Sequence, residues 1–287
     1  MRPAHLSLGH ASLSLLLLFG CSSSKLSSDG STSVGTPVVC NAPGYSTDSA
    51  PVTINEVDAL LRDPTGVAVS NLPVQVCGTD QCFNGSSGKD GKTVVQPHSK
   101  LTQAAFKYGD GFDFAELAAP LSTQATQDLG NIVALPLPDV ANGAAFPKSG
   151  TVTNGDVTLS LAKGTQTVHD TLTYEDTADL VFRTVQIPIA DSSAALDPSF
   201  KFELGYAVAP LGTTFCPAAQ LSLKNSLNWD PGTEVEVFIQ GLIAEQDWAP
   251  YGTWVKVADG SVNADGSSID TTSGGIPILS SVAVRRK

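Results

Sequence analysis

Short runs of alternating apolar and polar residues, separated by turn signals, fill the chain from about residue 52 onward. Val157, Leu159 and Leu161 alternate with polar residues in one clear example. Because successive side chains of a strand point to opposite faces of a sheet, such runs are typical of half-buried antiparallel strands. The turns between them carry proline at fixed φ and glycine at positive φ, as in residues 64–66 and 230–232. We therefore predict an all-β fold built from antiparallel β-sandwiches.

A second long alternation covers residues 201–208, and shorter ones cover residues 74–76 and 234–239. One face of residues 201–208 carries Phe202, Leu204, Tyr206 and Val208, and the other carries Lys201, Glu203, Gly205 and Ala207. We expect the first face in the core and the second toward solvent. Helical patterning is weak by comparison. The best helical candidate covers residues 113–127, and Pro120 interrupts it.

The first forty residues indicate export. Residues 13–19 are an apolar run of seven, which is too short for a bilayer-spanning helix of about twenty residues and is typical of a signal peptide. The run ends in Leu18-Phe19-Gly20-Cys21, which resembles the lipobox of bacterial lipoproteins. The resemblance implies cleavage before Cys21, lipidation of its thiol and acylation of the new amine, for example with palmitate. The alternative is an ordinary secretory signal in which Cys21 happens to follow Gly20.

A tether is expected after the signal peptide. Residues 22–37 are rich in Ser, Gly and Thr and show no apolar period, so we assign residues 1–20 to the signal and 21–45 to a flexible linker of roughly 25 Å. Two lipid chains or more hold a protein on a membrane almost permanently. Ser22 in place of Asp after Cys21 implies, by the lipoprotein sorting rule, the outer membrane of a Gram-negative host.

The five cysteines also favour an oxidising compartment. Lipidation of Cys21 leaves four, which allow three disulfide connectivities. Cys77 and Cys82 flank a turn-like tetrapeptide, so a hairpin would bring them within disulfide range and would leave Cys40 with Cys216. A zinc site is the alternative, but the four lack paired CxxC spacing and neighbouring histidines.

Two modules are expected in the folded part. Residues 63–76 and 85–92 resemble the carboxypeptidase regulatory-like, transthyretin-like β-sandwich, which implies a first module over residues 46–138. Residues 155–165 resemble the opening of ZU5-like β-sandwiches, and residues 216–266 resemble repeats of bacterial surface proteins, which implies a second module over 139–287. The whole chain is similar to lipid-anchored surface proteins of large Gram-negative genomes such as those of myxobacteria. Such modules imply structural or binding roles without catalytic residues.

Charge and histidine content narrow the function further. The formal net charge is −12, so a nucleic-acid partner is not expected, because a phosphate backbone attracts basic surfaces. Only His98 and His169 remain after signal cleavage, and the chain has none of the common nucleophile, zinc-protease or nucleotide-binding motifs. We therefore expect no catalytic residues. A carboxylate-based hydrolase is the remaining enzymatic alternative, and its candidates are Asp110, Asp113, Glu175, Asp176, Glu245 and Asp247.

Two other groups are candidate binding sites. Asp110 and Asp113 surround Gly111 and could contribute oxygen ligands to Ca²⁺, although they lack the spacing of a specific calcium loop and no cofactor is otherwise expected. Trp229, Trp248, Tyr251 and Trp254 could form a platform that stacks on sugar rings, or they could fill the core. The prediction is a non-enzymatic, lipid-anchored envelope protein that meets the membrane through its lipid. Envelope polysaccharide or another envelope protein is its candidate partner.

Overall fold

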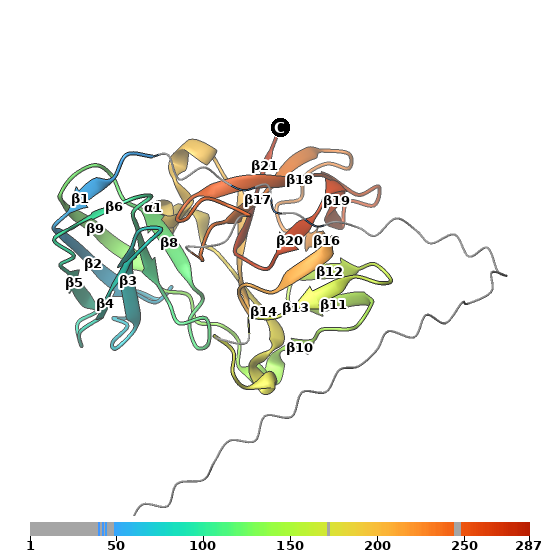
Figure 1. Cartoon of the computed structure of the whole chain (residues 1–287). Coiled ribbons are helices and arrows are strands. Elements are labelled where there is room, and N and C mark those ends of the chain that lie inside the picture. Colours follow the sequence, from blue (N-terminus) through green and yellow to red (C-terminus); the bar gives the residue numbers. More distant parts are fainter. Residues whose placement is uncertain (1–39, 41, 43, 45–48, 171–172, 244–247) are drawn as a thin grey trace, which may run out of the picture. The chain divides into compact units, whose positions relative to one another are not determined.

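Strands carry most of the regular structure, as the alternating pattern predicts. The computed structural model describes residues 40, 42, 44, 49–170, 173–243 and 248–287, and Val38–Lys287 form one compact unit. Strands β1–β9, blue to green in Figure 1, form one group, and β10–β21, yellow-green to red, form another. Among the helices of the described residues, none is long and apolar enough to cross a bilayer.

The first nine strands build three small sheets. Their orders are β1-β6, β5-β2-β9 and β4-β3-β7-β8, and every pairing is antiparallel except that of β2 with β9. Their bounds are β1 (Val52–Ile54), β2 (Glu56–Arg62), β3 (Pro73–Cys77), β4 (Cys82–Ser86), β5 (Lys92–Val95), β6 (Ser99–Leu101), β7 (Ala105–Tyr108), β8 (Leu117–Pro120) and β9 (Thr126–Val133).

The later strands form one large antiparallel sheet. Its order is β10-β14-β15-β21-β17-β18-β19-β16-β12-β11, and β13 and β20 also pair with β16. Their bounds are β10 (Ala144–Ala145), β11 (Gly150–Asn154), β12 (Val157–Leu161), β13 (Gln166–Val168), β14 (Val181–Gln186), β15 (Leu204–Ala209), β16 (Thr214–Lys224), β17 (Glu234–Gln240), β18 (Trp254–Val262), β19 (Ser268–Gly274), β20 (Ile276–Ile278) and β21 (Val282–Arg286).

Helices are short throughout the described part of the chain. The best helical candidate, residues 113–127, forms β8 and the beginning of β9 instead, and Pro120 is the last residue of β8. The observed helices are α1 (Ser193–Leu196), η1 (Val140–Asn142), η2 (Thr177–Asp179), η3 (Ile189–Asp191) and η4 (Pro198–Phe200).

The predicted alternation holds on β12 but is incomplete on β15. Val157, Leu159 and Leu161 are buried and the residues between them are half-buried, as expected. All six residues of β15 are buried, so the expectation that Gly205 and Ala207 face solvent is wrong. The physical reason is that protein covers both faces of β15. Small residues such as Gly205 and Ala207 occur on buried and on exposed faces alike, so the sequence does not reveal this burial.

Two hydrophobic clusters cover the two faces of this part of the large sheet. Leu204, Tyr206 and Val208 of β15 belong to the first cluster, whereas Ala207 and Ala209 belong to the second. β17 and β21 divide their side chains between the clusters in the same way. Most members of the second cluster come from β1–β9 and from the segments between and just after these strands, so this part of the chain packs on the large sheet.

The expected boundary between two modules at residues 138 and 139 coincides with the change from small sheets to the large sheet. The hydrophobic clusters cross this boundary, because the first cluster, formed mainly by the large sheet, also contains Cys77, Ala105 and Ala118. The division into two separate modules, residues 46–138 and 139–287, therefore stays a prediction. The sandwich-like packing of sheets is observed.

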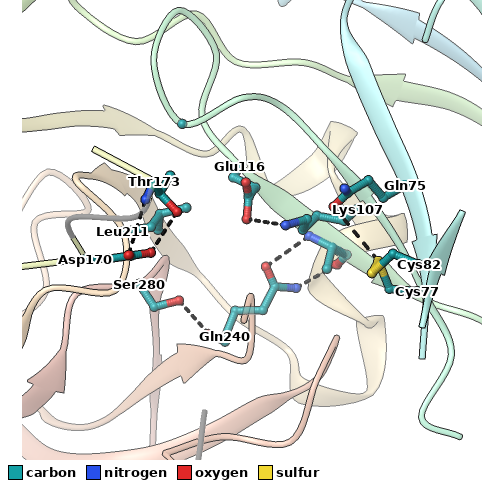
Figure 2. A network of polar contacts seen from close by, with 12 residues as sticks. Gln75, Cys77, Cys82, Lys107, Glu116, Asp170, Thr173, Leu211, Gln240 and Ser280 are labelled. Atoms are coloured by element: carbon teal, nitrogen blue, oxygen red, sulfur yellow. Dashed lines mark hydrogen bonds and ion pairs between the residues drawn. A yellow bond between two sulfur atoms is a disulfide. The ribbon is translucent and has the colours of Figure 1, made fainter. Parts of the chain in front are cut away.

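Gln240, the last residue of β17, joins the two groups of strands (Figure 2). Its side chain is fully buried. Its Nε2 donates to the Ala118 carbonyl of β8 at 2.7 Å and to the Ala195 carbonyl of α1 at 3.1 Å, and its Oε1 accepts from the Ala118 N–H at 3.3 Å. β8 lies at the end of its sheet, and the amide of Gln240 satisfies its backbone as a neighbouring strand would.

Arg183 of β14 makes a second connection of this kind. Its side chain is buried, with 1% exposed, and its guanidinium donates to the carbonyls of Gly111, Phe112 and Pro138 at 3.4, 2.6 and 3.2 Å. Burying a charge costs free energy unless hydrogen bonds compensate for the lost solvation. The hydrogen bonds to these three carbonyls offset the cost of burying the guanidinium. The loop before β8 is thereby held against the large sheet.

Both favoured disulfides are present. Cys77 lies opposite Cys82 across the β3–β4 hairpin, with their Cα atoms 4.0 Å apart. Cys40 is bonded to Cys216 of β16, with a Cα separation of 5.6 Å and a sequence separation of 176. This second bond attaches the segment before β1 to the large sheet.

We expect Gln240→Leu to lower the free energy of unfolding by roughly 2–4 kcal/mol, because it keeps the volume but leaves the backbone groups of Ala118 buried without partners. The measurement is chemical denaturation. Gln220→Leu is the matched control: Gln220 is exposed and bonds Gly274 and Thr271, so we expect about 0.5 kcal/mol or less. Equal losses in the two variants would contradict the role of Gln240.

Candidate functional site

A cavity of about 210 Å³ lies where the first group of strands meets the large sheet. Its polar and ionisable walls include Lys107 of β7, Glu116 before β8, and Tyr174 and Tyr251 from the later part of the chain. The full lining consists of Cys77, Cys82, Lys107, Glu116, Asp170, Thr173, Tyr174, Leu211, Leu242, Ile243 and Tyr251.

Lys107 and Glu116 form an ion pair in the wall of this cavity (Figure 2). Lys107 Nζ lies 3.1 Å from Glu116 Oε1, and the two side chains are only 21% and 14% exposed. Burial raises the pKa of Glu116, because the charged form loses solvation, and the positive charge of Lys107 offsets part of this effect. The negative charge of Asp110 also raises the pKa of Glu116, by less than burial does.

The two tyrosines of the cavity differ in how their hydroxyls are satisfied. Tyr174 Oη accepts a hydrogen bond from the Leu211 N–H at 2.9 Å and lies 3.4 Å from the Gly111 carbonyl. Tyr251 is 4% exposed, and its hydroxyl has no hydrogen-bond partner among the residues that the structure describes. Burial raises the pKa of Tyr251, and the charge of Glu116 raises it further.

Close backbone packing holds the turn that carries Tyr251. The turn pairs with the end of β17 through the bridge between Gly241 and Tyr251, and a Cβ on Gly241 would lie only 2.1 Å from the Pro250 carbonyl oxygen. Gly252 has a φ of +74° and faces Ala105 of β7, where a Cβ would come within 2.5 Å of the Ala105 side chain. Larger residues at either position would displace Tyr251 from the cavity wall.

Asp170 and Thr173 complete the polar part of the cavity. The Thr173 hydroxyl donates to Asp170 Oδ2 at 2.7 Å, and the Thr173 N–H lies 3.3 Å from Oδ1 (Figure 2). With Glu116 ionised, the wall holds two carboxylates and one ammonium group, that of Lys107. Leu211, Leu242 and Ile243 supply apolar surface. The cavity therefore combines a net negative charge with hydrocarbon walls.

The four aromatic residues predicted as a sugar platform lie in different places. Trp229, Tyr251 and Trp254 are 9%, 4% and 4% exposed, which favours the core alternative for these three. Trp254 Nε1 donates to the Ala195 carbonyl at 2.8 Å, and the guanidinium of Arg286 lies over the Trp229 ring at 5.4 Å.

Trp248 is partly exposed and lines two hollows. One, of about 370 Å³, includes the Cys40–Cys216 disulfide, and the other, of about 550 Å³, includes Gln220 and Lys256. It is therefore the member of the group that keeps surface for a ligand.

Of the two candidate calcium residues, Asp110 binds the backbone of its own loop. Asp110 Oδ1 accepts from the N–H groups of Phe112, Asp113 and Phe114, each at 2.9 Å. Asp113 is exposed. Asp110 thus shapes the loop whose carbonyls bind Arg183, and within the described residues there is no group of three or more His, Cys, Asp or Glu side chains placed to hold a metal ion.

The remaining candidates are spread over the surface or lie outside the described residues. His169 Nδ1 lies 3.1 Å from the Thr213 hydroxyl, burial lowers the pKa of His169, and His98 is exposed. Asp176 caps η2 by accepting from the Ala178 N–H, and Glu175 is exposed. The lipidation candidate Cys21 and the acidic residues Glu245 and Asp247 lie outside the described part of the chain.

Sequence reasoning missed Lys107, Glu116 and Tyr174. The only signal that could have found them is a pair of opposite charges nine positions apart in neighbouring strand-like segments, and that pattern is common on protein surfaces. No protein-family model, curated protein or solved structure matches this chain. The site is therefore interpreted from its own geometry.

We expect opposite effects on stability from removing the two tyrosine hydroxyls. Tyr174→Phe should lower the free energy of unfolding by about 1–3 kcal/mol, because it leaves the buried Leu211 N–H without an acceptor. Tyr251→Phe should leave stability unchanged or raise it by up to ~1 kcal/mol, because the hydroxyl that it removes has no partner. Thermal and chemical denaturation measure both. A loss in Tyr251→Phe equal to that in Tyr174→Phe would contradict this assignment.

Proposed function

We propose that this chain is a lipid-anchored, non-enzymatic protein of the cell envelope with a structural or binding role. The observation that carries the proposal is the cysteine pairing. Four of the five cysteines are joined in two disulfides, which are typical of proteins exported to an oxidising compartment. The fifth, Cys21, is the one that follows the lipobox-like residues.

The Cys40–Cys216 bond supports a tethered arrangement. It attaches the chain at residue 40, so a tether from Cys21 would be shorter than the interval 21–45 suggested by composition. A segment of this length spans roughly 25 Å as a flexible chain, which separates the body from a membrane surface. The sorting rule for lipoproteins, applied to Ser22, makes the outer membrane of a Gram-negative host the proposed location.

The contacts of the acidic loop residues support a non-enzymatic body. Asp110 and Asp176 accept backbone hydrogen bonds that shape their own loops, as structural residues do. The resemblances to carboxypeptidase regulatory-like and ZU5-like sandwiches, and to myxobacterial surface lipoproteins, point the same way. The candidate partners are the membrane, through the lipid, and envelope polysaccharide or protein.

Intact-mass analysis of the protein from its native membrane tests the anchor. We expect the mature chain to begin at Cys21 with a mass increment of two or three fatty acyl chains. The Cys21→Ser variant should stay uncleaved and lack that increment, because the thiol is the acceptor of the diacylglyceryl group. The Cys77→Ser/Cys82→Ser double variant is the control and should be acylated normally. A mature product that carries a free Cys21 thiol would refute the proposal.

Carbohydrate binding is a second candidate function, favoured by the partial exposure of Trp248 between two hollows. An envelope polysaccharide that stacks on this ring should change the tryptophan fluorescence of the protein. The change should disappear in Trp248→Phe and persist in Trp229→Phe, because Trp229 is buried. A response retained in Trp248→Phe would count against this surface as the binding site.

A further inference from the structure

The outer face of the β5-β2-β9 sheet is a polar surface that none of the sequence candidates uses. On β2 this face carries Asp58, Leu60 and Arg62, because the residues that alternate with them are buried. On β5 it carries Lys92, which lies opposite Leu60. Two hollows of about 450 and 540 Å³ follow the face, and Asn131 of β9 lines both of them. The two hollows therefore adjoin each other.

A β-bulge in β9 places Asn131 on the outer face. Asp128 pairs with Asp58 and Asn131 pairs with Leu60, so three positions of β9 match two of β2. Gly130 has a φ of +65° in this bulge, and its N–H donates to Asp128 Oδ1 at 2.8 Å. Without the extra residue Asn131 would face the core, since side chains alternate along a strand. Bulges are frequent next to functional sites, where they redirect a side chain.

Arg62 is a charged group of the outer face that has no partner. Its guanidinium makes no hydrogen bond or ion pair with any residue that the structure describes, although the residue is half-buried. The other described arginines, Arg183, Arg285 and Arg286, all bind carbonyl or carboxylate oxygens. A guanidinium has five N–H donors and binds planar oxygen-bearing groups well. The donors of Arg62 are therefore available to a ligand in the hollow that it lines.

The polar groups around Arg62 include both donors and acceptors. The amide of Asn131 and the carboxylate of Asp191 line the same hollow and have no hydrogen-bond partner in the described part of the chain. Asp63 Oδ1 accepts from N–H groups of its own loop, which leaves Oδ2 available. Carbon surface beside these groups comes from Pro64, Val133 and Pro188. A sugar matches this mixture, because each hydroxyl both donates and accepts and the ring carbons are apolar.

The charges of the two hollows disfavour an acidic ligand. Their lining carries two positive groups and four carboxylates, which are Arg62, Lys92, Asp58, Asp63, Asp128 and Asp191. The net charge is negative, so an acidic chain would be repelled. A neutral chain of hydroxyl groups meets no such repulsion and can bond to donors and acceptors alike. Each hollow is as large as a typical small-ligand site, and the two in series suit a chain of several rings.

We propose that the outer face of the β5-β2-β9 sheet binds a neutral oligosaccharide. Arg62 and Asn131 donate to its hydroxyl groups in the larger hollow, and Asp191 accepts from them. The sugar chain continues past Asn131 into the hollow that Lys92 lines. The proposal goes beyond the envelope role, because it requires neither the lipid anchor nor the surface around Trp248.

Four linear hexasaccharides test the proposal. Maltohexaose, laminarihexaose and N-acetylchitohexaose are neutral, and hexagalacturonate is acidic. Calorimetric titration of the mature protein near pH 7 should show binding of at least one neutral probe at millimolar concentration. Hexagalacturonate should bind at least about tenfold more weakly than that probe. Failure of all three neutral probes to bind would overturn the proposal, and so would hexagalacturonate binding as tightly as the best of them.

Variants locate the binding. Arg62→Gln and Asn131→Ala should each weaken binding of the best neutral probe by roughly fivefold to tenfold. Both should keep the thermal stability of the protein, because neither side chain has a partner among the described residues, and thermal denaturation thereby excludes a merely structural effect. Lys100→Gln is the matched control: it removes an exposed positive charge of β6, outside both hollows, and should leave binding unchanged.

Trp248→Phe separates this site from the carbohydrate surface proposed around Trp248. Binding of the best neutral probe at the outer face should be unchanged in this variant. Binding that is lost in Trp248→Phe and retained in Arg62→Gln would assign the sugar to the Trp248 surface and overturn the site at Arg62.

Discussion

The side-chain amide of Gln240 is the contact on which the assembly of the two strand groups depends. A strand at the end of a sheet exposes backbone groups that must be satisfied once they are buried. Gln240 reaches from β17 to both backbone groups of Ala118 and so replaces a missing neighbouring strand. Its further bond to Ala195 holds α1 in the same place, where Trp254 Nε1 also donates. Arg183 does the same for the loop before β8, with its guanidinium on backbone carbonyls.

The contact between Gln240 and β8 explains why part of the large sheet is buried on both faces, and it also explains where the cavity lies. Once β8 is held against β17, the outer faces of β15, β17 and β21 are covered by the second hydrophobic cluster. Glu116 lies immediately before β8, so the same contact places it in the wall of the cavity that Tyr251 also lines. The ion pair of Glu116 with Lys107 connects the residue before β8 to the neighbouring strand β7, and it lies in the wall of the cavity. Charge in the cavity is therefore a consequence of how the sheets pack.

Much of the fold and little of the site could be predicted from the sequence. The alternation of Val157, Leu159 and Leu161 identified a strand and its inner face, because the two-residue period is a local property. The turn between Cys77 and Cys82 identified a disulfide for the same reason, and the second disulfide followed by elimination. Tyr251 was singled out, but as a member of a stacking platform. Glu116 and Tyr174, which line the same cavity as Tyr251, are more than seventy positions away along the chain, and no local pattern reports such proximity.

The sequence by itself determined the strand content, the turns, the cysteine framework and the acidic balance, because each of these is set by neighbouring residues or by simple counts. The tertiary structure alone decided that β15 is buried on both faces, that Gln240 completes the edge of another sheet, and that Lys107, Glu116, Tyr174 and Tyr251 line one cavity. The physical reason is that burial and hydrogen-bond partnership depend on which surfaces meet. That choice is made by side chains distant in sequence, whereas strand formation requires only the local alternation of apolar and polar residues.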